Sequence, residues 1–312
     1  MKRLIFFAAV LSTLIFLLVF PKQAFMASAE GLELWFYTVL PSLLPFLILS
    51  DFLIHTEKIP ELLRFFAPFF QKCFGLSVYG SYAFILGLFC GYPMGAKLTG
   101  DLLRENKIDI TEARYLLTFS NNASPIFISS YILLNNLKIQ NTSMTTFVIL
   151  YSSTAITSFI FRIRYRRFSV HTTCRETPEV TLKSSLGRLI DVSIMNGFET
   201  ITRLGGYIIL FSIGAAMILQ ITGEHSALAM ILPAIVEITT GIHQIADSSL
   251  TFPLKYMLIL TFTSFGGIST IAQTKGMLTG TPLSISVYII GKTVHAVCTF
   301  FLVLLFFILK II

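Results

Sequence analysis

The sequence predicts an all-α protein that crosses a membrane several times and whose helices are broken in the manner of a transporter. Of its 312 residues, 54% are hydrophobic and 12% are charged, and the mean hydropathy is +0.79. Soluble domains carry about 25% charged residues, so this composition indicates a polytopic membrane protein. Glycine, proline and polar residues interrupt the apolar sequence at residues 91–97, 120–125 and 264–269. Broken backbone at membrane depth is tolerated where it packs in protein or lines a watery cavity, as in transporter binding sites.

The chain opens on an apolar run at residues 4–20, directly after a basic start. Signal peptides have a similar composition, and the small residues 27–29 resemble a cleavage motif. The run lies at the upper end of the length of such segments, and residues 21–23 separate it from the small residues. We therefore predict an uncleaved membrane helix, with residues 1–30 forming that helix and a connector.

Residues 31–162 are predicted to form the first of two related units. Within residues 60–76, phenylalanines are mixed with Arg64 and Lys72, which is typical of an amphipathic helix at the membrane surface. Asp109 and Glu112 have the spacing of a helix N-cap. The apolar runs of this unit are 31–54, 79–98, 113–134 and 143–162.

A basic loop at residues 163–190 leads to the second predicted unit, residues 191–312. The basic loop accounts for much of the net charge of +7, so the charge indicates a cytoplasmic membrane flank and no nucleic-acid partner. The apolar runs of the second unit are 204–221, 227–246, 254–272 and 285–309.

The distribution of basic residues predicts that run 79–98 is a re-entrant hairpin. With the N-terminus inside and every run crossing fully, the basic loop would lie outside, against the lysine and arginine bias that sets orientation. If run 79–98 instead turns back at its Gly-Tyr-Pro break, the loops around Arg64, Arg104 and Arg166 all lie inside. The loop near Asn135, which is poor in lysine, then lies outside.

The two predicted units show weak internal similarity. Residues 31–50 parallel 197–216, the break at 91–93 parallels 265–267, and residues 110–134 parallel 283–305. On the topology just argued, the paired segments enter from opposite sides. The sequence therefore predicts an inverted repeat, an architecture in which substrate sites lie near the midplane between the repeats.

Catalytic and metal-binding motifs find no support in the sequence. The four cysteines are scattered without a Cys-x-x-Cys pair, and the five histidines have no metal-ligand spacing. No nucleophile elbow is present. We expect neither an enzyme nor a metal or cofactor site.

Five motifs, in order along the chain, resemble those of the YlbJ family of sporulation integral membrane proteins, which carry the nucleoside recognition, or Gate, domain. They are LPSLLPF at 40–46, GYPMGAK at 91–97, SNNASP at 120–125, EITTG at 237–241, and SFGGIS at 264–269 with Gln273. The N-terminal helix and the basic loop match nothing distinctive.

This resemblance implies a core similar to the concentrative nucleoside transporters, with two re-entrant hairpins that face a central site. It also implies a multi-pass protein of a bacterial cell membrane, and for the sporulation branch the movement of dipicolinic acid across the outer forespore membrane. The substrate would then be a small anionic metabolite.

The spacing of Gly87, Gly91 and Gly95 has two interpretations. Small residues at every fourth position allow close packing of two helices, whereas Pro93 argues against an uninterrupted helix and favours a hairpin tip. Lys97 either extends to the membrane interface or provides a counter-ion for an anionic substrate.

The polar residues of the later breaks also allow two interpretations each. Asn121 and Asn122 either tie helices together or belong to an unwound turn that offers hydrogen bonds to a ligand, the reading that we favour. Glu237, inside run 227–246, is a candidate to carry a proton, bind sodium or orient substrate; alternatively the run is shallow and Glu237 lies at the surface.

The remaining candidate functional residues are charged and lie near the two ends of the second unit. Lys292 and His295 share one face of the last helix, where they either extend outward or line an anion path. Arg203 and Glu199 are expected to form a local pair near the membrane edge.

The predicted substrate-binding residues come from the breaks and from the last helix. They are Gly91, Tyr92, Pro93, Gly95, Lys97, Ser120, Asn121, Asn122, Ser124, Pro125, Glu237, Thr239, Thr240, Ser264, Gly266, Gly267, Ser269, Gln273 and Lys292.

Two other functions stay open beside transport of an anion. One is a nucleoside or organic-solute carrier coupled to sodium or protons, and the other is a membrane scaffold for spore assembly that transports nothing. The bilayer is the expected partner besides the substrate, and the sequence leaves open whether the protein forms a homo-oligomer.

Overall fold

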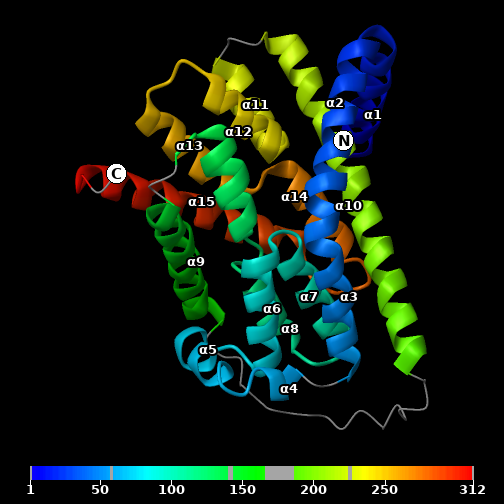
Figure 1. Cartoon of the computed structure of the whole chain (residues 1–312), viewed down its shortest axis with the longest axis vertical. Helices are drawn as coiled ribbons and strands as arrows, with labels where there is room; N and C mark the ends of the chain where they lie inside the picture. Colours follow the sequence, from blue (N-terminus) through cyan, green and yellow to red (C-terminus); the bar gives the residue numbers. More distant parts are fainter. Residues whose placement is uncertain (1, 57–58, 140–142, 166–185, 224–226, 311–312) are drawn as a thin grey trace.

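The structure, a computed structural model, describes residues 2–56, 59–139, 143–165, 186–223 and 227–310 (Figure 1). All regular elements in these residues are helices. Five helices in the described part are long and apolar enough to cross a membrane: Pro21–Thr56, Met144–Tyr165, Gly187–Thr222, Phe252–Met277 and Ile285–Ile308. The chain is therefore a polytopic α-helical membrane protein.

A long bent helix and its partner form one side of the molecule. The bounds of these elements are α1 (Lys2–Val19), α2 (Pro21–Glu33), η1 (Leu34–Val39), α3 (Leu40–Thr56) and α10 (Leu186–Thr222). Helices α2, η1 and α3 are continuous from Pro21, a residue suited to the first turn of a helix. This long helix therefore includes the predicted connector, and it begins at Pro21, ahead of the predicted span at residues 31–54. Trp35, in the π-helical segment η1, fixes this helix to α10 by donating from Nε1 to the carbonyl of Ile201 at 2.9 Å.

The Gly-Tyr-Pro break joins two helices that fold back on each other. The elements before and around it are α4 (Ile59–Leu62), α5 (Ala67–Phe74), α6 (Val78–Cys90) and α7 (Met94–Arg104). Helix α5 meets α6 at 91°, and α6 packs against α7 along the first hairpin. Gly91 makes the turn with φ +88°, a conformation that side chains disfavour. The structure therefore contains the predicted hairpin turn, and its entry from one membrane side stays a prediction.

The break at residues 120–125 interrupts the next helix, giving α8 (Ile110–Leu117), η2 (Phe127–Asn136) and then α9 (Ser143–Tyr165). Asp109 accepts a hydrogen bond from the Glu112 amide at 2.7 Å, which confirms the predicted N-cap. A Cβ placed on Gly87 or Gly95 would lie 2.0 or 2.1 Å from the Ser120 carbonyl oxygen. Both predicted roles of these glycines are therefore present. Gly91 turns the chain, and Gly87 and Gly95 allow the hairpin to pack closely on the break at residues 120–125.

The second half of the chain contains another helix hairpin, at a position that the sequence interpretation did not predict. Its elements are α11 (Ala227–Val236), α12 (Ile238–Asp247), α13 (Phe252–Phe265), α14 (Gly267–Met277) and α15 (Ile285–Ile308). Run 227–246 was predicted as one stretch. Its first helix ends at Val236, and the chain turns back at Glu237. A Cβ on Gly241 would lie 2.1 Å from the Ala234 Cα, so α11 and α12 pack almost backbone to backbone.

The helix order corrects the internal matches predicted from the sequence. The turn at 91–93 joins two packed helices, whereas the break at 265–267 lies within the long span α13–α14, so these two are not equivalent. Residues 110–134 contain a broken helix, whereas 283–305 lie mostly in the unbroken helix α15. The element order instead runs long helix, hairpin, broken helix and last helix in each half. Shared composition misled the comparison because glycine marks both kinds of break.

Candidate functional site

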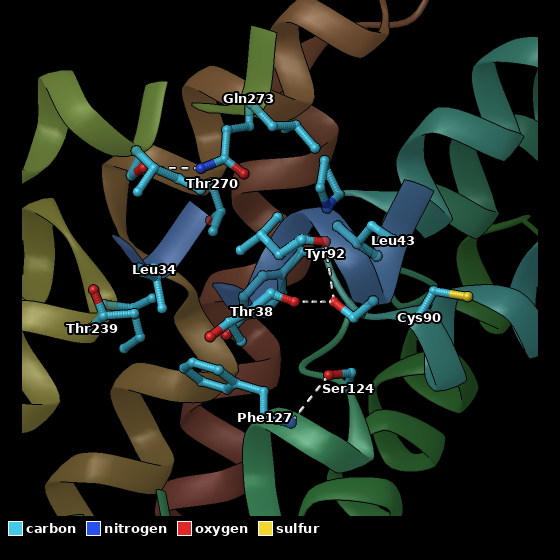
Figure 2. A pocket seen from close by; sticks show the side chains of 18 of the residues that line it. Leu34, Thr38, Leu43, Cys90, Tyr92, Ser124, Phe127, Thr239, Thr270 and Gln273 are labelled. Atoms are coloured by element: carbon cyan, nitrogen blue, oxygen red, sulfur yellow. Dashed lines mark hydrogen bonds between the residues drawn. The ribbon is translucent and has the colours of Figure 1, made fainter. Parts of the chain in front are cut away.

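A cavity of about 100 Å³ lies where the two hairpin turns meet both broken helices (Figure 2). Its walls come from elements far apart in the sequence, and their side chains point toward a common space in the figure. Of the predicted substrate-binding residues, the lining of this main cavity includes Gly91, Tyr92, Pro93, Ser124, Glu237, Thr239, Ser269 and Gln273.

The first hairpin brings its turn against the break at residues 120–125. The ideal Cβ position of Gly91 lies 3.0 Å from both the amide nitrogen and the Cβ of Ser124, so the two backbones are in close contact. Tyr92 projects beside Phe127, with ring centroids 6.5 Å apart. The Tyr92 hydroxyl is buried and has no hydrogen-bond partner among the described residues. It is therefore a polar group that a ligand could satisfy.

The second hairpin turn places Glu237 at the main cavity. Glu237 is 4% exposed and is the N-cap of α12. Its Oε2 accepts hydrogen bonds from the Thr240 amide at 2.8 Å and the Thr240 hydroxyl at 3.0 Å, and Oε1 accepts from the Thr239 amide at 3.1 Å. These donors and the helix N-terminus suit a carboxylate. Glu237 is therefore buried inside the protein, and the alternative of a surface position does not hold.

Helix α14 supplies hydroxyl and amide groups from the other side. Gln273 Nε2 donates to the Ser269 Oγ at 3.0 Å, and the Thr270 hydroxyl donates to the carbonyl of Gly267 at 3.0 Å. Gly266 and Gly267 both have positive φ angles, +86° and +79°, which turn the chain into α14. This turn places Ser269 and Gln273 at the cavity.

Sequence reasoning missed the wall contributed by the long helix and α10. These residues are Leu34, Thr38, Val39, Ser42, Leu43, Leu204 and Ile208. The LPSLLPF string with its two prolines marked this region as unusual, but it was assigned to an ordinary span. The signal that could have found it is the pair of hydroxyl residues Thr38 and Ser42, four apart on one face of an apolar helix.

The two lysines predicted near the site have different surroundings. Lys97 is paired with Asp101, with Nζ 2.5 Å from Oδ2, and Arg104 binds the same carboxylate, so Lys97 is already neutralised. Lys292 is 1% exposed and forms no ion pair among the described residues. Its Nζ donates to the Asn121 carbonyl at 3.0 Å and lies 5.7 Å from the centre of the Tyr92 ring. Lys292 therefore lies beside Tyr92, which lines the main cavity, although it does not line the cavity itself.

A second, smaller cavity of about 10 Å³ lies near the same break and includes His295 in its lining. His295 is 3% exposed, and its Nε2 is 2.9 Å from Ser153 Oγ and 3.2 Å from Thr154 Oγ1. Thr154 also donates to the Asn122 side-chain oxygen at 3.2 Å. The predicted residues Asn122 and Ser264 line this small cavity and not the main one.

The other predicted site residues line neither cavity: Gly95, Lys97, Ser120, Asn121, Pro125, Thr240, Gly266, Gly267 and Lys292. Asn121 donates from Nδ2 to the Tyr288 hydroxyl at 3.0 Å, while its Oδ1 has no partner among the described residues. Arg203 and Glu199 form the predicted local ion pair on an exposed face. Within the described part of the chain, no three His, Cys, Asp or Glu side chains gather as a metal site.

Comparison with known proteins gives one relative that matches along most of the chain. It is the sporulation integral membrane protein YlbJ of Bacillus subtilis (strain 168), with 26% identity over 309 residues, 89% of this chain and 76% of that protein. No family model and no solved structure matches. The chain is thus a multi-pass α-helical membrane protein that is similar, over most of its length, to a sporulation integral membrane protein.

Proposed function

We propose that this chain is a membrane transporter whose substrate binds in the main cavity. The observation that carries the proposal is the meeting of two hairpin turns and two broken helices at one cavity inside a helical membrane protein. Such breaks leave backbone groups available in the membrane interior, and transporters use them to bind polar substrates near the midplane. A scaffold has no comparable need for a cavity at this place.

We infer further that the two halves are inverted repeats, as in the fold of concentrative nucleoside transporters. In Figure 1, α4 and α5, which lead into the first hairpin, lie at the bottom, whereas α10 leads into the second hairpin at the top. Both hairpin turns nevertheless line the same cavity. Hairpins that enter from opposite sides and meet centrally would allow each half to close one side of the site in turn.

The favoured substrate is a small anion, and dipicolinic acid moving across the outer forespore membrane fits both the resemblance and the sporulation relative. Lys292 supports this choice because a buried ammonium group without a carboxylate partner is costly. An anion bound beside Tyr92 would provide the missing negative charge. Lys97, predicted for the same role, has Asp101 as its partner and is assigned no part in binding.

One observation favours a second candidate, an ion-coupled carrier of a nucleoside or similar neutral solute. Glu237 lines the main cavity, and a carboxylate there would repel an anion but accept hydrogen bonds from hydroxyl or N–H groups of a neutral solute. The surrounding amides and hydroxyls offset part of this charge. The two candidates therefore differ in whether Lys292 or Glu237 dominates recognition.

Uptake into proteoliposomes tests the proposal, with labelled dipicolinate and a labelled nucleoside as substrates. Lys292→Met removes the unpaired charge at nearly constant volume and should abolish dipicolinate uptake, a loss of at least tenfold. Lys97→Met is the matched control, because Asp101 retains Arg104 and the charge lost was already neutralised. It should keep most of the uptake.

The outcomes separate the functions. Nucleoside uptake that survives Lys292→Met but fails in Glu237→Gln would support the neutral-solute candidate instead. Full dipicolinate uptake by Lys292→Met would refute the role given to this lysine. No uptake of any solute by wild-type protein that is folded and inserted would favour the scaffold.

A further inference from the structure

Lys292 and His295 are two buried basic side chains that no described carboxylate neutralises. They lie three residues apart on one face of α15 and are 1% and 3% exposed. Both interact with the same break in α8–η2: Lys292 donates to the Asn121 carbonyl, and Thr154 links His295 to the side chain of the next residue, Asn122. Both residues therefore contact the region of residues 121–122. Lys292 lies beside Tyr92 of the main cavity, and His295 lines the small cavity.

The surroundings of His295 contain hydroxyl and amide groups but no acid. Helix α9 contributes Ser153 and Thr154 with the phenol of Tyr151, α13 contributes Thr263 and Ser264, and the break contributes Asn122. Helices α8 and α14 also pack on α15 and carry the ionisable residues Glu112, Arg114 and Lys275, but none of these three lines the small cavity beside His295. Lys292 lies three residues before His295 on α15 itself and is buried as well.

The two ring nitrogens of His295 have different surroundings. Nε2 is held by the hydroxyls of α9, whereas Nδ1 is buried without a hydrogen-bond partner among the described residues. The small cavity beside the ring, about 10 Å³, is at the lower limit of the space that one water molecule needs. A protonated ring could therefore be solvated there by a water and the nearby oxygens.

Two positive charges three residues apart on one face of a buried helix repel each other, so holding both at once requires compensating negative charge. A dianion in the main cavity changes this balance, since its two negative charges can offset an ammonium and an imidazolium together. We propose that binding of a dianionic substrate is coupled to uptake of one proton by His295. This inference rests on the proposed anionic substrate and adds its coupling ion and the residue that carries it.

Because of thermodynamic linkage, the proposal can be tested by a binding measurement, without a transport assay. If binding takes up one proton, a fall in pH must tighten binding, by up to tenfold in Kd per pH unit. The experiment measures dipicolinate binding to purified full-length protein by calorimetry between about pH 6 and 8, where the carboxyl groups of free dipicolinate are ionised. Repeating it in two buffers of different ionisation enthalpy gives the number of protons taken up.

The variants assign the proton to a residue. His295→Gln can keep a hydrogen bond to the hydroxyls of Ser153 and Thr154 but cannot hold a charge, so it should bind dipicolinate with no proton uptake and a flat pH profile. His243→Gln is the matched control, because His243 is 60% exposed and pairs with Asp247 on the surface. It should behave as the wild type does.

Each result decides a different point. Binding by the wild type without proton uptake overturns the inference and leaves the anion proposal standing, and this measurement decides even if His295→Gln does not fold. Uptake that persists in His295→Gln but disappears in Glu237→Gln assigns the proton to the carboxylate and overturns the role of His295. Failure of the wild type to bind dipicolinate overturns the anionic substrate and the coupling together.

Discussion

Glu237 combines two roles at the residue level, because it caps α12 and lines the main cavity. Glu237→Gln keeps an acceptor oxygen but loses the charge, so we expect a stability loss of about 1 kcal/mol and normal membrane insertion. Transport, or its pH dependence, should change. Thermal unfolding in detergent and uptake at several pH values measure the two effects.

The matched control for Glu237 is Asp109→Asn, the same change of acid to amide at the N-cap of α8. Asp109 is exposed and does not line either cavity, and asparagine caps helices about as well as aspartate, so this variant should lose little stability and keep its transport. If Glu237→Gln also transports normally at every pH, then Glu237 only caps a helix and takes no part in function.

Gly95 makes a second prediction at this scale, because its missing side chain lets the first hairpin contact the Ser120 backbone. Gly95→Ala places a Cβ 2.1 Å from a carbonyl oxygen, so the hairpin must move away. We expect destabilisation of about 1–3 kcal/mol, visible as a lower unfolding temperature.

Gly206→Ala is the control, since Gly206 lies inside α10 with nothing within 4 Å of the added Cβ. Alanine is the better helix former there, so this variant should be as stable as the wild type or up to about 1 kcal/mol more stable. Equal unfolding temperatures for both variants would show that the hairpin does not pack as described.

At the level of elements, the sequence predicted some breaks well and others poorly. The 91–93 turn was predictable because a Gly-Tyr-Pro string inside an apolar run offers no continuous helix. The turn at Glu237 was not, because a single buried acid was interpreted as a functional group inside one run. Its capping role depends on α12 folding back onto α11, where Gly241 meets Ala234, and that contact is not visible from local sequence.

The first hairpin gives a prediction about its insertion. The Ser77 amide at the start of α6 donates to Glu112 of α8 at 2.7 Å, and α8 in turn packs against α7. Both ends of the hairpin are thereby held together. In a background with all native cysteines replaced, Gln71→Cys and Glu105→Cys should be labelled by an impermeant thiol reagent from the same membrane side.

Asn135→Cys controls this labelling, since the loop near Asn135 is predicted to lie on the other side and Asn135 is exposed at the end of η2. Residues 71 and 105 on opposite sides would mean that α6 and α7 cross the membrane, and the re-entrant hairpin would be wrong.

For the whole molecule, composition was enough to predict a polytopic helical protein, whereas the arrangement of its halves was not predictable. The two halves share an order of elements, in which a hairpin precedes a broken helix, and only packing distinguishes a hairpin turn from a break in a helix when both contain glycine. For the same reason, the site was found in part. Residues at the breaks could be recognised from their glycines, prolines and polar groups, whereas Thr38 and Ser42 line the cavity from a continuous helix. Lys292 was predicted as well, but it lies beside Tyr92 and does not line the cavity.

The proposed inverted arrangement of the two halves leads to the last prediction. The second hairpin leads through residues 248–251 into α13, and α10 enters this hairpin at the end of the molecule opposite α4 and α5 (Figure 1). Ser249 is exposed in that connection, so Ser249→Cys should be labelled from the side opposite Gln71→Cys and Glu105→Cys, together with Asn135→Cys. If Ser249→Cys is instead labelled with residues 71 and 105, both hairpins enter from one side. The two halves could then not close opposite sides of the cavity in turn, and alternating access by an inverted repeat would be excluded even if the chain transports its substrate.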